Sequence, residues 1–421
     1  MHNESNSARK GIGMTYETLP HWFSGSPLTH TVARDIMQYG PIARTAIAQM
    51  HGLSQGTVSR ITSDLMHWGV IRETGAATGT GEATAGDGRL PYGFEPKQRT
   101  GERGRPQTAL EIVSDGHVFA GVKLHDRMAT GILTDARCRQ LGDAITVPCD
   151  DSHADAVAEA IGGLVEALRS SARAQGLPDP QAMGVAIGGY VTEAGNPVEA
   201  PFLHWHAEVD LAAMLDDRCG VPTGVFNDID SLLLHELWFG EAIGLPRCAM
   251  VTIGAGVGYG LAEDGRIVGA QDRTYGLAGH LLVDPDGPAC FAGLNHRGCA
   301  QCLINDSLAD EYSKAIGSSS SYDDYAAAAR RGVPQARQLL MREAYRLGVL
   351  IGLAANLTMP VKVLVAGEGA PLAAVEMESI RRGVREFRPS QAPDVRFAML
   401  PGGWERWAAG AATQIIARFV G

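Results

Sequence analysis

The chain has 421 residues, of which 45% are hydrophobic and 20% charged, and its formal net charge is −11. This composition is typical of globular domains and excludes disordered and fibrous proteins, and the length allows roughly two to four domains. The sequence has no run of roughly 18 apolar residues, and its first ten residues lack the apolar stretch of a signal peptide. We therefore expect a cytoplasmic protein without a membrane partner.

The charge is unevenly distributed along the chain. Residues 1–110 carry 11 Lys and Arg against 9 Asp and Glu, a net charge of +2, whereas the remaining residues carry 25 against 38. A uniformly basic nucleic-acid coat is therefore excluded. A polyanionic partner should contact the N-terminal part of the chain rather than the acidic body.

The first ordered region is predicted to be helical. A helix over residues 31–39 is followed by the stop signal Gly40-Pro41, and a second helix covers residues 43–50. After a tight turn, Ser54 can cap a third helix over residues 54–67, because its hydroxyl can accept a hydrogen bond from a free backbone N–H group.

The third helix has an apolar and a polar face. Its apolar residues recur with helical period at Val58, Ile61 and Leu65. With the strand pattern at residues 70–72, the helices predict a winged helix-turn-helix whose third helix enters the major groove, while Arg44 contacts phosphate. The alternative is a generic three-helix packing unit. The residues expected nearest the DNA are Ser54, Gln55, Thr57, Ser59 and Arg60.

Residues 75–108 are poor in apolar side chains and rich in Gly, Thr and Ala, which predicts a long loop or linker. This segment ends in a basic sequence with Arg103, Arg105 and Pro106. Beside a helix-turn-helix, the two arginines are expected to lie on phosphates or to enter a minor groove, where Arg suits the negative potential. The alternative is a solvated basic loop.

From residue 118 onward, short apolar strands alternate with amphipathic helices. Helices are predicted at 154–174, 211–219, 334–357 and 404–419. Strands are predicted at 118–124, 128–133, 141–147, 183–187, 223–226, 250–253 and 361–365. Because strand–glycine loop–helix units occur twice, the sequence predicts an α/β fold with two lobes and a cleft between them.

These patterns resemble the ROK family (repressors, open reading frames and kinases), in its transcriptional-regulator branch, over about residues 28–421. The similar sequences are Gly40 to Thr45, Gly52 to Arg60, Gly104-Arg105-Pro106, Ala200-Pro201, Trp205, Asn227-Asp228, Gly254 to Gly260 and Gly279-His280. The resemblance implies an N-terminal winged helix-turn-helix followed by a two-lobed actin-like (ribonuclease H-like) α/β body. It also implies a homodimer or a homotetramer.

The expected domain organisation follows from this resemblance. A winged helix-turn-helix at 28–74 is followed by a wing or linker with a basic arm at 75–110. The first α/β lobe covers 111–230 and is closed by the C-terminal helix 404–421. The second lobe covers 231–403 and contains a zinc loop at 280–302.

The chain departs from the family's kinases at the first phosphate loop. Those kinases hold ATP phosphates with Asp-x-Gly-Gly-Thr, whereas the aligned hairpin here, residues 123–127, lacks the glycines that allow close backbone approach. The second glycine-rich loop, residues 254–260, is then interpreted as a structural turn. Asp228 matches the kinase base, but we expect it to bind a sugar hydroxyl rather than to catalyse phosphorylation. The alternative role for Asn227 and Asp228 is capping a turn.

The sugar pocket that the resemblance implies is also altered. Two positions that are polar in the family are here Phe202 and Leu277. Phe202 can stack on a sugar face or fill the pocket, and lost hydrogen-bond partners are costly in a sugar site. A modified sugar, a different ligand and no ligand all remain open. The expected effector-binding residues are Gly189, Phe202, Asn227, Asp228 and His280.

Three of the seven cysteines lie between residues 290 and 302, which in a reducing compartment favours a metal site over disulfides. The family holds a structural zinc with one His and three Cys, but here Ala292 replaces one of those cysteines. The expected ligands of one zinc ion, which satisfy tetrahedral coordination, are His280, Cys290, Cys299 and Cys302. His296 is an alternative ligand, and buried free cysteines are the alternative to a metal.

Together these features predict a DNA-binding transcriptional repressor of carbohydrate-metabolism genes. Its partners would be a double-stranded DNA operator and a small carbohydrate-like effector in the cleft. One alternative is a ROK-type sugar kinase with an appended DNA-binding domain, against which the altered first phosphate loop argues. The other is a regulator that no longer senses a sugar.

Overall fold

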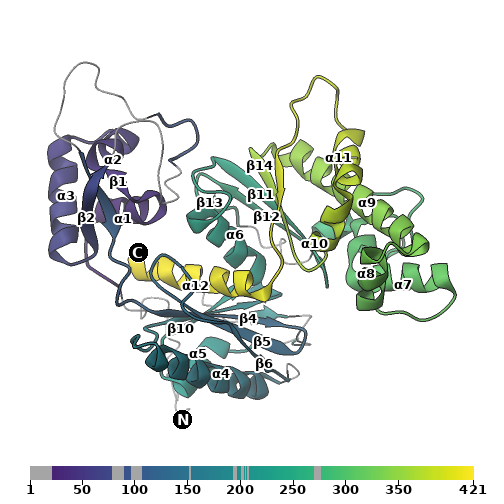
Figure 1. The fold of residues 1–421 in the computed structure, drawn as a ribbon, viewed down its shortest axis with the longest axis horizontal. Helices are drawn as coiled ribbons and strands as arrows, with labels where there is room; N and C mark the ends of the chain where they lie inside the picture. The colour runs from purple at the N-terminus through teal and green to yellow at the C-terminus, as the bar shows by residue number, and fades with distance from the viewer. Residues whose placement is uncertain are drawn as a thin grey trace, which may run out of the picture.

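The computed structural model consists of an N-terminal domain and two α/β lobes (Figure 1). The residues that it describes are 21–77, 90–95, 107–150, 153–192, 197–200, 203, 205, 208–269 and 276–421. No helix among them is long and apolar enough to cross a bilayer.

The N-terminal domain is a winged helix-turn-helix. Its helices are α1 (Pro27–Tyr39), α2 (Arg44–His51) and α3 (Gln55–His67), and its strands are β1 (Ile42–Ala43), β2 (Ile71–Ala77) and β3 (Gln107–Ile112). Ser54 caps α3 as predicted, because its hydroxyl oxygen accepts a hydrogen bond from the Thr57 N–H group at 3.1 Å. Strand β3 lies between β1 and β2 and pairs with both in antiparallel fashion. The sequence had suggested only a linker over most of this strand.

The first lobe is a five-stranded mixed sheet in the order β10-β7-β4-β5-β6. Its strands are β4 (Phe119–His125), β5 (Met128–Thr134), β6 (Ile145–Pro148), β7 (Met183–Ile187) and β10 (Thr223–Asn227), and a short pair follows β7 at β8 (Tyr190–Val191) and β9 (Pro197–Glu199). Helices α4 (Ala154–Ala174) and α5 (Leu211–Cys219) cover one face and have the predicted bounds. Helix α12 (Trp404–Val420) covers the other face (Figure 1).

The second lobe is also a five-stranded mixed sheet, in the order β13-β12-β11-β14-β15. The strands are β11 (Arg247–Ile253), β12 (Val257–Glu263), β13 (Arg266–Ile267), β14 (Lys362–Ala366) and β15 (Phe397–Met399). Its helices are α6 (Asp228–Phe239), α7 (Asn305–Ile316), α8 (Tyr322–Arg330), α9 (Pro334–Thr358), α10 (Ala370–Ala373) and α11 (Met377–Glu386), with short 3-10 helices at η4 (Leu277–His280), η5 (Ala300–Leu303) and η6 (Ala374–Glu376). This arrangement confirms the predicted two-lobed α/β fold.

Residues of β11 alternate between the two hydrophobic layers of the second lobe, as expected for a strand. Met250 packs in the cluster that contains α6 and α12, whereas Ala249 and Val251 pack in the cluster that contains α9. Because both faces are covered, the buried part of the strand is apolar except for Thr252.

Helix α12 lies very close to the first sheet. A Cβ atom at Gly121 would lie 2.0 Å from the carbonyl oxygen of Ala408, so only glycine allows this approach. At its N-terminal end α12 places Trp404 and Trp407 beside the cleft. At its C-terminal end the Phe419 carbonyl accepts a hydrogen bond from the Trp22 N–H group at 2.8 Å. One helix therefore reaches from the cleft to the N-terminal domain.

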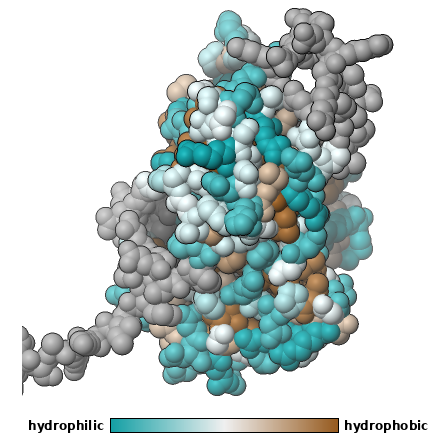
Figure 2. Space-filling model, turned by 90° about the vertical axis from the view of Figure 1, so that its left-hand side faces the viewer, coloured by the Kyte–Doolittle hydropathy of each residue, from teal (hydrophilic) through white to brown (hydrophobic). Residues whose placement is uncertain are grey.

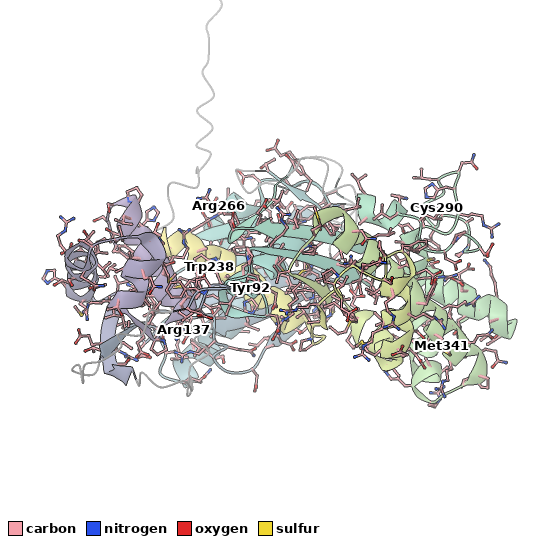
Figure 3. The ribbon with its side chains drawn as sticks, turned by 90° about the horizontal axis from the view of Figure 1, so that it is seen from above. Tyr92, Arg137, Trp238, Arg266, Cys290 and Met341 are labelled. Atoms are coloured by element: carbon pink, nitrogen blue, oxygen red, sulfur yellow. The ribbon has the colours of Figure 1, made fainter. Side chains whose placement is uncertain are left out.

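The winged domain makes a second contact with the first lobe. The Arg137 guanidinium donates a hydrogen bond to the Gly40 carbonyl oxygen at 3.1 Å. Figure 3 shows Arg137 beside the N-terminal domain and Cys290 near the opposite end of the molecule. Any communication between these ends must therefore pass through the body.

Candidate functional site

Helix α3 presents a polar surface, as the sequence predicted. Val58, Ile61 and Leu65 are buried against the rest of the domain. Gln55, Ser59 and Arg60 are exposed, and Thr57 is half-buried because its hydroxyl lies 2.8 Å from that of Ser54. Figure 2, which views the molecule from the side of α3, shows hydrophilic residues interspersed with residues of intermediate hydropathy on the upper part of this face, and hydrophobic residues lower down. The exposed side chains are therefore free to contact a ligand, whereas Ser54 and Thr57 begin the helix.

Arg44 is held inside the winged domain. Its Nε donates a hydrogen bond to the Thr62 hydroxyl at 2.9 Å, and its Nη2 lies 2.8 Å from the Glu73 carboxylate. These contacts join α2 to α3 and β2, so Arg44 has a structural role, and its contact with phosphate stays a prediction. Arg103 and Arg105, predicted as arm contacts, lie outside the described residues.

The two lobes enclose a cavity of about 260 Å³. The first lobe contributes the end of β4 and Gly189, and the second contributes Asp228 at the start of α6, the glycine-rich turn after β11 and Glu368. Trp404 and Trp407 of α12 line the same cavity. The predicted cleft is therefore present, and its volume lies just below the range of about 300–1,000 Å³ that is usual for small-ligand sites.

A buried ion pair lines this cavity. The Lys123 ammonium lies 2.6 Å from Asp228 Oδ2, and the two side chains are only 5% and 15% exposed. Asp228 Oδ1 accepts a hydrogen bond from the Ile229 N–H group, and the Lys123 ammonium lies over the Trp407 ring, 5.3 Å from its centroid. Asp228, predicted to bind a sugar hydroxyl, is thus already paired in this structure.

The hairpin between β4 and β5 differs from a phosphate-binding loop. The turn contains only Asp126 and Arg127, with φ angles of 40° and 58°, as in tight two-residue turns. The preceding His125 ring stacks on Trp404, with centroids 3.9 Å apart. Burial, together with the Lys123 charge, lowers the pKa of His125 to about 4, so its ring is neutral near pH 7. A short turn backed by an aromatic stack leaves no backbone cradle for phosphates.

The second glycine-rich loop has a packing reason for its glycines. A Cβ atom at Gly258 would lie 2.2 Å from the Ile229 side chain of α6. The nearby turn is covered by Glu368, whose carboxylate accepts hydrogen bonds from the Ala255 N–H group and from Asn305 Nδ2, the latter at 2.8 Å. These contacts support the interpretation of residues 254–260 as a structural turn.

Asn227 begins helix α6. Its Oδ1 accepts a hydrogen bond from the Asp230 N–H group at 3.1 Å, and its Nδ2 donates to the Gly189 carbonyl at 2.8 Å. Asn227 therefore has the capping role that the sequence left as an alternative, and it fixes Gly189 at the cavity wall. Its direct contact with an effector stays a prediction.

The other predicted pocket residues are less central. His280 is not among the described residues that line the cavity, although its neighbours Gly276 and Gln301 are. Leu277 is 56% exposed and lines a separate apolar cavity. Phe202 lies outside the described residues, so whether it fills the pocket stays open.

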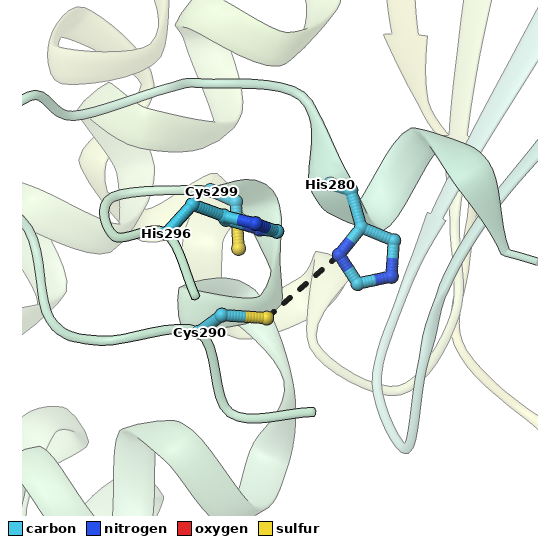
Figure 4. Close-up of side chains that lie close together, drawn as sticks. All are labelled: His280, Cys290, His296 and Cys299. Carbon is cyan, nitrogen blue, oxygen red and sulfur yellow. Dashed lines mark hydrogen bonds between the residues drawn. The ribbon is translucent and has the colours of Figure 1, made fainter. Parts of the chain in front are cut away.

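A potential metal site forms in the loop that follows η4 (Figure 4). The ligand atoms of four residues lie within 4.8 Å of one another, and these residues are His280, Cys290, His296 and Cys299. Cys290 Sγ and His280 Nδ1 are 3.7 Å apart. Around a tetrahedral zinc with bonds of about 2.0–2.3 Å, neighbouring donor atoms lie roughly 3.3–3.8 Å apart, so two N and two S donors here fit this ion.

Cys302, which we expected from the sequence to be the fourth ligand, does not belong to this group. His296, the alternative ligand, lies with the other three residues instead. Cys302 lies on η5, is 3% exposed and packs in the hydrophobic cluster beneath the loop. Burial raises the pKa of its thiol to about 12, which disfavours the thiolate that a metal needs. The structure therefore corrects the expected ligand set at this position.

Several cavity residues were not found from the sequence, namely Lys123, Trp404, Trp407 and Glu368. One signal was available for Lys123, because a lysine inside an otherwise apolar strand requires a partner when buried. Trp404 and Trp407 are separated by one helical turn, which is equally typical of core packing. Their roles depend on how distant elements meet.

Known proteins are similar to this chain over most of its length. Residues 120–412 match the ROK family. The chain is 27% identical over 356 residues to the DNA-binding transcriptional dual regulator NagC of Escherichia coli K12, covering 80% of this chain and 79% of NagC. It is 25% identical over 369 residues to the DNA-binding transcriptional repressor Mlc of the same organism. The match covers 81% of this chain and 80% of Mlc.

Two solved structures show the same fold. A ROK family transcriptional regulator described as a homologue of the E. coli Mlc protein has a TM-score of 0.69 and 23% identity, and covers 93% of this chain and 98% of that one. A ROK family glucokinase from Streptomyces griseus, in complex with glucose and AMPPNP, has a TM-score of 0.58 and 23% identity. The match covers 70% of this chain and 98% of the glucokinase. Because the matched family region exceeds half of the sequence, the chain belongs to the ROK family, as predicted, with its N-terminal domain outside that region.

Proposed function

We propose that this chain is a DNA-binding transcriptional regulator, a repressor of carbohydrate-metabolism genes that responds to a sugar or sugar-derived effector. The observation that carries the proposal is the fusion of an exposed, polar recognition helix to a ROK body. NagC and Mlc, which are named as DNA-binding regulators, are similar over about four fifths of the chain. The Mlc-homologue structure covers 93% of the chain, so the likeness extends beyond the ROK region into the N-terminal domain.

The cleft supports a binding role rather than phosphoryl transfer. A kinase needs a phosphate cradle and a free carboxylate base. Here the β4–β5 turn has two residues, and Asp228 is paired with Lys123. We therefore expect no ATP-dependent sugar phosphorylation, and turnover that depends on Asp228 would favour the kinase alternative.

A structural zinc is the second part of the proposal. His280, Cys290, His296 and Cys299 would hold it, and the ion would supply a cross-link between η4 and the loop 290–299. The buried thiols of Cys290 and Cys299 lie next to two imidazoles, which is a donor set that suits zinc. Because Gln301 and Gly276 beside this loop line the cavity, the cross-link would fix one wall of the effector site.

Helix α12 supplies a route from the cleft to the DNA-binding domain. Trp407 lies against Lys123 in the cavity, and at the other end the Val420 carbonyl lies 2.6 Å from His30 Nδ1 of α1. An effector that contacts the Lys123–Asp228 pair can therefore shift α12 and with it the winged domain. A ligand moves this equilibrium only by its differential affinity for the two arrangements.

The recognition helix would act in pairs. We propose a homodimer or homotetramer in which two copies of α3 read a two-fold related operator. Gln55, Ser59 and Arg60 would contact base edges or phosphates, with Arg103 and Arg105 adding arm contacts.

The test of DNA binding uses full-length protein and operator sequences selected from random DNA by the wild type. Arg60→Ala should weaken binding by about 1 kcal/mol or more, roughly what one good contact contributes. Arg381→Ala is the matched control, because it removes an exposed positive charge from helix α11 in the distant second lobe. Equal affinities for wild type, Arg60→Ala and Gln55→Ala would contradict the assignment.

The test of effector response uses the same DNA. A bound effector should change operator affinity, and Asp228→Ala should abolish that change while operator binding remains. A protein that binds its operator but shows no thermal shift with any sugar tested would support the alternative of a regulator without sugar sensing.

A further inference from the structure

The charges that line the cavity indicate which ligands it can accept. Among the described lining residues, acidic side chains outnumber basic ones, and Lys123 is committed to Asp228 at 2.6 Å. Asp126 and Glu368 also line the cavity, the first from the β4–β5 turn and the second from the loop after β14. The carboxylates of the two lobes therefore face one space from opposite sides.

The position where the cavity would accept an anion is already filled. Backbone N–H groups of a glycine-rich turn are an ordinary anion-binding device. Here the turn after β11 donates its Ala255 N–H group to the Glu368 carboxylate, which also accepts from Asn305. A Cβ atom at Gly254 would lie 3.1 Å from Glu368 Oε2, so the carboxylate lies directly against the turn. A phosphate would have to displace this side chain.

His125, which also lines the cavity, has a buried ring nitrogen atom without a hydrogen-bond partner. The His125 side chain is 7% exposed, and its Nδ1 is buried and has no hydrogen-bond partner. Its Nε2 lies 2.8 Å from the Thr130 hydroxyl, and Nδ1 lies 4.0 Å from Asp126 Oδ2. Because Nδ1 is buried, it is not open to the cavity and makes no contact there. Among the described lining residues, the acceptors at this end of the cavity are therefore the carboxylates of Asp126 and Glu368.

A protonated amine satisfies these groups better than any other ligand group. An ammonium offers three N–H donors and one positive charge. Its charge would be attracted by the carboxylates of Asp126 and Glu368. A divalent metal fits less well, because among the described residues the only group of three or more clustered His, Cys, Asp or Glu ligands is the one around His280.

We propose that the cleft binds a polyol that carries a protonated amine, such as an amino sugar, and excludes phosphorylated sugars and nucleotides. This proposal rests on the proposed function, in which the cleft is the effector site. The ammonium would lie between Asp126 and Glu368, and the polyol would extend toward Asp228 and Gly189. A phosphate ester in the same place would bring negative charge toward the carboxylates of Asp126 and Glu368, and like charges repel.

The test is calorimetric titration of the full-length protein at about pH 6, where an ordinary amine is protonated. The matched ligands are glucosamine, glucose, N-acetylglucosamine and glucosamine 6-phosphate. We expect glucosamine to bind at least about tenfold more tightly than the three others. Asp126→Asn and Glu368→Gln should each remove most of this preference, because they delete charge but keep the shape. Asn also tolerates the positive φ angle at position 126.

Asp143→Asn is the control, since Asp143 is an exposed acid of the first lobe away from the cavity. Equal or tighter binding of glucose or glucosamine 6-phosphate would overturn the amine proposal and leave the regulator proposal intact. A thermal shift with Mn²⁺ or Mg²⁺ alone, lost in Glu368→Gln, would replace the amine with a metal and overturn it as well. No binding of any of these ligands would overturn the amine proposal, whereas the regulator proposal fails only if operator binding also fails.

Discussion

Replacing Lys123 by Met should destabilise the body of the protein strongly. Lys123→Met keeps the length of the side chain but removes the ammonium that lies 2.6 Å from Asp228. Asp228, only 15% exposed, then remains as a carboxylate without its cation in the closed part of the cleft. Leaving one charge of a buried pair unpaired typically costs about 3–5 kcal/mol.

The expected cost lies at the lower end of that range. Asp228 keeps one hydrogen bond, because its Oδ1 accepts from the Ile229 N–H group at 2.8 Å. Some exposure also lets water reach the other oxygen. We therefore expect a loss of about 3 kcal/mol, which for a chain of this size corresponds to a fall in melting temperature of about 3–4 °C.

Differential scanning calorimetry or urea unfolding can measure this effect, with two comparisons. Lys314→Met is the matched control, because Lys314 is 73% exposed and its pair with Asp310 should contribute at most about 0.5 kcal/mol. The double variant Lys123→Met/Asp228→Asn should recover most of the loss, since no buried charge then lacks a partner. The reasoning is refuted if Lys123→Met is as stable as Lys314→Met, or if the double variant is no more stable than the single one.

Three further outcomes are expected. Elemental analysis should find one zinc per chain, lost in Cys299→Ser and retained in Cys302→Ser; the reverse pattern would restore the ligand set expected from sequence. Burial raises the pKa of Glu343 to about 7, above an unfolded value near 4.3, so its stabilising contribution is lost progressively as the pH rises from about 4.3 through about 7. Melting temperatures should therefore fall less across this window in Glu343→Gln than in the wild type, and parallel curves would contradict the assignment. Trp407→Ala should reduce the change in operator affinity that an effector causes while basal operator binding remains, and an unchanged response would argue against α12 as the route.

The parts of the fold that depend on local sequence could be predicted. Helices α4 and α5 have the predicted bounds because apolar periodicity and end signals lie within the segment itself. Strand β3 was missed because its partners lie elsewhere in the chain. Arg72 and Glu111, for example, pair across the wing although 39 positions separate them. A strand stabilised mainly by non-local pairing has no equivalent local signal.

The candidate site could likewise be predicted only where it depends on local sequence. Residue types and spacing indicated a cleft, a recognition helix and a Cys/His metal loop. They could not indicate that Lys123 reaches Asp228, 105 positions later, or that His296 rather than Cys302 faces the other ligands. The direction of Cys302 is set by η5, which turns its side chain into the core beneath the loop. The spacing of residues in the sequence limits which of them can come close together, but it does not determine the direction in which each side chain points.

The position of α12 would let one fold connect the proposed effector site to the winged domain without a separate relay domain. The helix is the last element of the chain, yet it packs on the first sheet, lines the cleft with Trp407 and holds the winged domain through Phe419 and Val420. A Cβ at Gly410 would lie 2.7 Å from the backbone of Ser231 in α6, so α12 also packs closely against the second lobe. Close-packed interfaces of this kind shift as units rather than deform gradually. If the lobes move relative to each other, α12 must therefore shift at one or more of its contacts. Because its contact with the winged domain is smaller than its contact with the first sheet, the shift is expected at the winged domain.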